Sequence, residues 1–162
     1  MIRIFLHDNG ERLEGVWATP AGKGLYKIES VPFLHMAPTC GDVVEAAPDP
    51  ARGSDLVAVR TKKKGGRWVA VYNWYAQPGA TAREVVARLH DAAKKKQLVV
   101  ESCLEPKDGV AGCVYIAAPK QATPAQVDGI VDGAGAPADF LRVLPVRAAP
   151  KRKKTKLKKK KR

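Results

Sequence analysis

Residues 1–64 are dominated by short runs in which apolar and polar positions alternate. Turn-forming residues separate the runs, among them Asn9-Gly10, the stretch 20–24 and a Pro/Asp/Gly-rich stretch that ends at Gly53. Such alternation is typical of half-buried strands, and a spacing of about ten residues is typical of antiparallel neighbours. We predict a small antiparallel β meander that curls toward a barrel. The expected strands span 2–7, 12–19, 25–30, 41–46 and 55–61.

One segment, 31–40 (VPFLHMAPTC), breaks this alternation with two prolines and no clear period. Proline lacks the amide hydrogen that a strand interior needs, so a strand is not expected here. We predict an ordered crossing loop whose apolar anchors are Phe33, Leu34 and Met36.

From Arg67 onward the pattern alternates between strand and helix. The segment 67–75, RWVAVYNWY, is the densest aromatic and β-branched stretch, and it follows the charged glycine run 62–66. Such residues favour a half-buried pleated surface, so we place a domain junction before this segment and a central strand within it. Further strands are expected at 98–104, 113–118 and 140–146.

Two helices are predicted between these strands. Thr81 with Glu84 matches a capping box, and Thr123 followed by Pro124 matches a second helix start. Lys94 to Lys96 would lie in the last turn of the first helix, where cations favour the helix dipole. The apolar face of that helix consists of Val85, Leu89, Ala92 and Ala93.

The resulting order, βαββαβ, is the split-βαβ or ferredoxin-like arrangement, in which the first and third strands are central. The predicted fold class is therefore α+β. We expect a β-rich N-terminal domain at 1–64, a ferredoxin-like domain at 67–146 and a disordered, lysine-rich tail at 147–162.

The charge of the chain is concentrated at its end. The protein has 29 Lys and Arg against 16 Asp and Glu, a formal net charge of +13. Ten of the basic residues and none of the acids fall in 151–162, so 13 − 10 leaves +3 for residues 1–150. This distribution indicates a basic arm for polyanions rather than a basic groove on the folded body.

The tail, KRKKTKLKKKKR, is the leading candidate for a nucleic-acid contact. Lysines that neutralise phosphates release counterions, but without arginine forks or aromatic residues they read little sequence. The alternatives for the tail are a solubilising end or a surface for acidic proteins or anionic lipid. The candidate contact residues are Lys151, Arg152, Lys153, Lys154, Lys156, Lys158, Lys159, Lys160, Lys161 and Arg162.

Two accessory contacts are considered on the body. Lys62, Lys63 and Lys64 either extend the basic surface or are solvated loop lysines. Trp68, Tyr72 and Trp74 share one parity of their strand. If the opposite, valine-bearing face meets the helices, these aromatic residues form a surface on which bases stack, as in RNA-recognition motifs. The alternative is that this face packs against the N-terminal part or a second subunit.

Catalytic and metal motifs are weak in this sequence. His35 and Cys40 are the closest His/Cys pair and lack the further ligands of a structural zinc site; His7 and His90 lie elsewhere. No nucleophile elbow or phosphate loop occurs. We expect no enzyme activity, no metal and no cofactor; a remote alternative is an enzyme cleft lined by His35 and Cys40.

The cellular setting follows from the cysteines and the N-terminus. Cys40, Cys103 and Cys113 form no CxxC pair, which favours reduced thiols. The first apolar run is too short for a secretory signal, and no run reaches the ~18–20 apolar residues that span a bilayer. We expect a soluble cytoplasmic protein, with nucleoid or ribosome association as one option.

Several segments resemble a bacterial family called domain of unknown function 4265. They are Trp17 to Pro20, Gly24 to Tyr26, Val31 to Phe33 and above all Gly41 to Ala46 (GDVVEA). The resemblance covers roughly 2–146, and it implies a small β-rich N-terminal part joined to a βαββαβ part. Residues 35–40 depart from the family's aromatic segment before GDVV, and the lysine tail is an addition to the family pattern.

Our sequence-based hypothesis is a non-enzymatic binding protein whose lysine tail associates with DNA or RNA without sequence specificity. In this interpretation the folded body carries a second function or forms a homodimer. The alternative is a protein–protein adaptor or immunity-type protein that binds an unidentified protein through its body, with the tail tuning solubility or location.

Overall fold

The computed structural model describes residues 1–8, 12–35, 37–74, 82–104, 112–136 and 141–146 of the 162-residue chain. These residues form nine strands, two α-helices and one 3-10 turn within the described ranges. In chain order the elements are β1 (Ile2–Asp8), β2 (Arg12–Gly22), β3 (Leu25–Ile28), β4 (Val43–Pro48), the turn η1 (Pro50–Arg52), β5 (Leu56–Lys63), β6 (Arg67–Trp74), α1 (Ala82–Lys94), β7 (Val99–Leu104), β8 (Gly112–Pro119), α2 (Pro124–Gly133) and β9 (Leu141–Val146).

The first five strands form a ring in the order β1-β2-β3-β4-β5, with antiparallel pairing between chain neighbours. The ring closes through one parallel pair, Phe5 opposite Val57. It is therefore barrel-like, with a short seam between β1 and β5. Alternate positions point inward, as the period of two predicts. The buried core of the ring consists of Ile4, Leu6, Val16, Ala18, Ile28, Val44 and Ala46.

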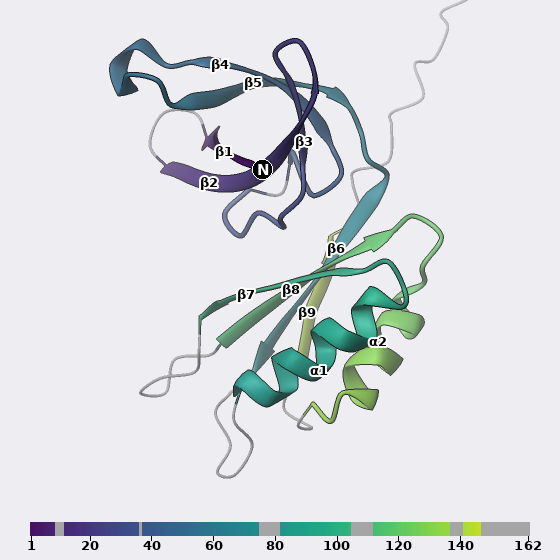
Figure 1. The fold of residues 1–162 in the computed structure, drawn as a ribbon. Helices are drawn as coiled ribbons and strands as arrows, with labels where there is room; N and C mark the ends of the chain where they lie inside the picture. The colour runs from purple at the N-terminus through teal and green to yellow at the C-terminus, as the bar shows by residue number, and fades with distance from the viewer. Residues whose placement is uncertain (9–11, 36, 75–81, 105–111, 137–140, 147–162) are drawn as a thin grey trace, which may run out of the picture.

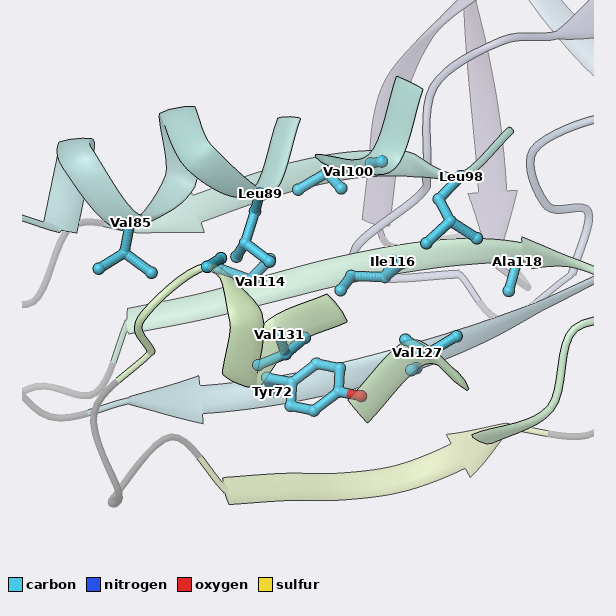
Figure 2. Close-up of a cluster of buried hydrophobic side chains, with 13 residues drawn as sticks. Tyr72, Val85, Leu89, Leu98, Val100, Val114, Ile116, Ala118, Val127 and Val131 are labelled. Atoms are coloured by element: carbon cyan, nitrogen blue, oxygen red, sulfur yellow. The ribbon is translucent and has the colours of Figure 1, made fainter. Parts of the chain in front are cut away.

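The remaining strands form a four-stranded antiparallel sheet in the order β7-β8-β6-β9. Both helices lie on the same side of this sheet (Figure 1). Val85 and Leu89 of α1 and Val127 and Val131 of α2 are 2% exposed or less, and they lie over the sheet residues drawn in Figure 2. Burying aliphatic side chains of this size contributes about 1.5–3 kcal/mol each.

The opposite face of this sheet contacts the loop 29–41 at the end where the ring lies (Figure 1). Val31 and Cys40 from the loop pack with Val69 of β6 and Ala117 of β8, all at most 9% exposed. The Phe33 ring meets the Tyr115 ring edge-on, with centroids 4.9 Å apart. The five-stranded ring β1–β5 and the four-stranded sheet are therefore joined by a small apolar cluster as well as by the chain itself.

The observed elements agree with the sequence prediction to within three residues at each strand boundary. The Thr123 cap is confirmed: its hydroxyl accepts from the Gln126 amide, while the Gln126 side chain accepts from the Thr123 amide. The predicted Thr81 cap lies outside the described residues. No helix in the described part of the chain is long and apolar enough to span a bilayer.

One predicted anchor of the crossing loop is wrong. Leu34 is 56% exposed, whereas Val31 and Cys40 are 2% exposed and hold the loop against the sheet. The loop turns Leu34 outward because its neighbours are fixed: Phe33 packs on Tyr115, and His35 is buried. Met36, the third predicted anchor, is outside the described residues.

Candidate functional site

The ten predicted tail contacts, Lys151 to Arg162, lie outside the described residues, as does the predicted tail domain 147–162. The point from which the tail extends is defined, because β9 ends at Val146 opposite Val69 of β6. Val69 belongs to the cluster shared with the loop 29–41. The tail therefore starts at the end of the sheet that adjoins the ring.

Two of the three accessory lysines, Lys62 of β5 and Lys64 just after it, are engaged within the body. Lys62 Nζ lies 3.0 Å from Glu45 Oε2, and the same oxygen accepts from Arg60. Lys64 Nζ donates to Asp42 Oδ2 at 3.1 Å. Hydrogen bonds from Arg60 and Lys62 lower the pKa of Glu45, so this carboxylate stays ionised between them. These carboxylates neutralise much of the positive charge that Lys62 and Lys64 would bring to an extended basic surface, the first of the two alternatives considered for them.

The condition considered for base stacking on β6, that its valine-bearing face meets the helices, is not met. Trp68 and Tyr72 point toward the helices, and Val69 and Val71 point toward the loop 29–41. Tyr72 is 2% exposed and lies among the buried side chains drawn in Figure 2. Its hydroxyl donates to Asp128 of α2 at 2.7 Å. The Trp68 indole N–H donates to the Ala122 carbonyl. Tyr72 therefore offers no surface to a base.

The physical reason lies in side-chain size and polar tips. Large rings fill the wide space between a sheet and its helices, and a buried hydroxyl or indole needs a hydrogen-bond partner there. The partners are Ala122, just before α2, and Asp128, within α2. The small Val69 instead lets the loop backbone approach the other face closely. The side chain of Trp74 lies outside the described residues.

The GDVVEA motif builds the contact between ring and sheet. Asp42 is 1% exposed, and its carboxylate accepts from the Thr39 amide, the Gly65 amide and Lys64 Nζ at 2.7–3.1 Å. Gly41 has φ +86°, a conformation that L side chains rarely adopt. Asp42 thus links the end of the crossing loop to the segment that leads into β6.

Gly65 is required at this contact for steric reasons. A Cβ added to Gly65 would overlap the backbone carbon and oxygen of Gly41. Arg67, two residues later, donates to the carbonyl of Gln97 in the turn after α1 and to the carbonyl of Ala117 on β8. The charged glycine run, predicted as a domain junction, is therefore fastened on both sides by specific hydrogen bonds.

Glu14 is a buried polar residue that sequence reasoning missed. Its carboxylate is 9% exposed and accepts from the amides of Phe33, Leu34 and His35, and His35 Nδ1 lies 3.0 Å from Oε2. The signal was present in the sequence, because Glu14 shares the inward parity of Val16 and Ala18. A buried carboxylate needs such donors, and here it fixes the loop that contacts the sheet.

The cysteine and histidine candidates do not converge. Burial raises the pKa of the Cys40 thiol to about 11, and its Sγ donates to the Glu29 carbonyl. His35 faces Glu14, while His7 and His90 are exposed on other elements. Among the described residues no group of three His, Cys, Asp or Glu side chains is arranged to hold a metal ion.

Comparison with known proteins places the chain among proteins without an assigned activity. No curated protein matches the sequence. A solved structure titled "Novel crystal structure of a hypothetical protein from Neisseria gonorrhoeae" is similar in fold, with a TM-score of 0.51 and 13% sequence identity; the match covers 83% of this chain and 88% of that one. The family model described as "Domain of unknown function (DUF4265)" matches residues 14–133, and the chain belongs to that family.

Proposed function

We propose that the protein is a non-enzymatic binding protein that associates with nucleic acid, DNA or RNA, through its lysine-rich segment 151–162. The observation that carries this proposal is the segregation of charge: ten basic residues and no acid in twelve positions, against a net +3 for residues 1–150. A phosphate backbone is the partner that such a segment binds without sequence preference. A cytoplasmic location beside nucleoid or ribosomes fits this role.

The ion pairs of the body support a division of labour. Three lysines of the body each lie within 3.1 Å of a carboxylate oxygen: Lys27, Lys62 and Lys64. Part of their positive charge is therefore neutralised by carboxylates of the body. The tail has no acid of its own. Counterion release is therefore concentrated in the tail, and the body contributes a scaffold.

A ferredoxin-like assignment of residues 67–146 belongs to the same proposal. The order βαββαβ, the central position of β6 and β8, and the two helices on one face support it. In this assignment the tail follows the last strand of the unit. The other face of the sheet carries the ring, through the cluster around Val31, Cys40 and Val69.

The test is binding of the full chain to fluorescently labelled duplex DNA and single-stranded RNA across a salt series. With six phosphates contacted, log Kd against log salt has a slope of about 5 on duplex DNA, so affinity falls roughly 10³-fold between 50 and 200 mM salt. A variant with all ten Lys and Arg of 151–162 replaced by Gln is expected to lose this binding. A control variant in which each tail Lys is replaced by Arg and each tail Arg by Lys is expected to keep this binding, because its charge is unchanged.

The matched control removes charge from the body instead. Replacing Lys94, Lys95 and Lys96 by Gln takes away three positive charges at the end of α1 and is expected to change affinity less than threefold. If the tail variant binds as tightly as the parent, the proposal is wrong and the contact lies on the body. Absence of binding by the parent would also overturn it.

A second candidate function, a protein–protein adaptor acting through the body, is favoured by Leu34. This residue is 56% exposed on a loop that Glu14 holds rigid beside the Phe33–Tyr115 contact. A rigid exposed apolar side chain is a suitable anchor for a partner. If neither the parent nor the tail variant binds nucleic acid above background, the search turns to protein partners or a second copy of the chain.

A further inference from the structure

An exposed aromatic side chain stands on the outer surface of the ring. Trp17 of β2 is 53% exposed, in contrast with the buried Tyr72 of the sheet. Directly opposite Trp17 on β1 is Arg3, and the next outward pair along the same strands is Phe5 with Gly15. Opposed residues of an antiparallel pair lie about 5 Å apart at Cβ, so these side chains adjoin one another. We call Arg3, Phe5, Gly15 and Trp17 the outer aromatic face.

The period of two along β1 and β2 creates this face. Ile4 and Leu6 point into the ring core, which leaves Arg3 and Phe5 outside; likewise Val16 and Ala18 point inward and leave Trp17 outside. Gly15 adds no side chain between them. The Arg3 guanidinium occupies the space over Gly15 and lies 5.2 Å from the Phe5 ring centroid, a cation–π distance.

The charges around Trp17 suit a phosphate-bearing ligand. Arg3 is exposed and has no carboxylate partner among the described residues. On the other side of Trp17, Lys27 and Thr19 both contact Glu29, at 3.1 and 2.8 Å. Burial alone raises the pKa of Glu29, but the hydrogen bonds from Thr19 and Lys27 outweigh it and lower the pKa. Arg3 therefore supplies the uncompensated charge of this surface.

We propose that the outer aromatic face is a stacking site for single-stranded nucleic acid, with a base on Trp17 and the adjoining phosphate on Arg3. This inference rests on the tail-mediated binding proposed above and assigns the body a role in it. A base in a single strand exposes its face to an indole, whereas a duplex keeps its bases stacked on each other. The tail supplies affinity for any polyanion, and Trp17 supplies preference for unpaired strands.

The position of the tail in the chain allows the tail and Trp17 to contact the same nucleic-acid strand. The sixteen residues after Val146 reach at most about 55 Å when extended. A compact folded chain of this length has a radius of gyration of about 15 Å, so the extended tail is longer than the radius of the body. Binding of the tail therefore raises the effective concentration of the same strand at Trp17.

The experiment compares full-length parent, Trp17→Ala and Trp17→Phe on labelled (dT)12 and on a 12-base-pair duplex at the same salt. Loss of one base–aromatic stack weakens binding about 5- to 150-fold, so we expect that loss for Trp17→Ala on (dT)12 and a smaller one for Trp17→Phe. The duplex affinity of both variants stays within twofold of the parent. Unlabelled (dT)12 quenches the tryptophan emission of the parent and leaves that of Trp17→Phe unchanged.

Two further variants make the test specific. Arg3→Gln is expected to weaken (dT)12 binding severalfold and to reduce its salt dependence by about one phosphate contact. Leu34→Ala removes a similarly exposed apolar side chain from the loop 29–41 and leaves both affinities unchanged. Thermal unfolding of each variant verifies that it is folded at the assay temperature.

The outcomes separate this inference from the proposed function. Binding of both probes by the parent, with the same affinities in Trp17→Ala, leaves the tail proposal intact and overturns the stacking site. An equal loss on (dT)12 and duplex also overturns it, since Trp17 would not distinguish unpaired strands. A parent that binds neither probe refutes the tail proposal itself.

Discussion

The contact between ring and sheet and the outer aromatic face each contain a glycine, and the two glycines have opposite kinds of neighbour. At the contact, Asp42 and Gly65 are closed in by backbone: three donors hold the carboxylate, and the Gly65 Cα hydrogen faces the Gly41 carbonyl. On the outer face, Gly15 meets only the end of the Arg3 side chain. A neighbour that is backbone cannot yield, whereas a flexible side chain can.

This difference shows where the molecule is fixed and where it is free to bind. A buried carboxylate with satisfied donors specifies one arrangement, and any change leaves unpaired groups inside. The exposed side chains of Trp17 and Arg3 make few contacts with the body, so they can contact a ligand with little loss of existing interactions. The two regions lie on the same ring, so substitutions matched between them separate structural from functional effects.

The largest effect is expected at Asp42. Asp42→Ala leaves the Thr39 and Gly65 amides without their acceptor in a site that is 1% exposed, and we expect it to lower the free energy of unfolding by about 2–4 kcal/mol. Urea denaturation measures this. Lys64→Gln removes only a 62% exposed partner of the same carboxylate and should cost less than about 1 kcal/mol. Equal costs for both would mean that the buried amides contribute little.

The next effect comes from a pair of glycine substitutions. Gly65→Ala forces the Gly41 backbone to move and should cost about 1–3 kcal/mol, as overpacking does. Gly15→Ala only displaces the Arg3 guanidinium, so its cost should stay within about 0.5 kcal/mol. Chemical denaturation of the two variants side by side tests the comparison. It fails if Gly15→Ala is as destabilising as Gly65→Ala, because the outer face would then be as tightly constrained as the contact.

The smallest effect concerns Glu101 on β7, two residues beyond Val99 of the shared cluster and opposite Tyr115. Burial raises the pKa of this carboxyl from its ordinary value of 4.5. Ionisation is then harder in the folded state, so Glu101 reduces stability once the pH rises above the folded-state pKa. Glu101→Gln should raise Tm by about 1–2 °C at pH 7 and not at all below pH 4.

Thermal melts of the parent and Glu101→Gln from pH 3.5 to 8 provide the measurement. A Tm difference for Glu101→Gln that grows as the pH falls would have the wrong sign. It would mean that folding lowers the pKa of Glu101 instead of raising it.

The period of two and the period of a helix determined most of the architecture from the sequence. Alternation fixed which residues of β1 and β2 face inward, and the Thr123-Pro124 start fixed α2, because both depend on neighbours within a few residues. The concentration of charge in 151–162 is likewise a property of the sequence alone. So is the family resemblance carried by GDVVEA, which the match over 14–133 confirms.

The tertiary structure decided what alternation leaves open, namely which face of a strand meets which neighbour. Trp68 and Tyr72 share a parity, but only the helices that pack on β6 determine that this parity is buried. In the same way, Glu14 and Asp42 became structural centres because loops distant in the sequence bring amide donors to them. Local sequence sets the two faces of a strand, and long-range packing chooses between them.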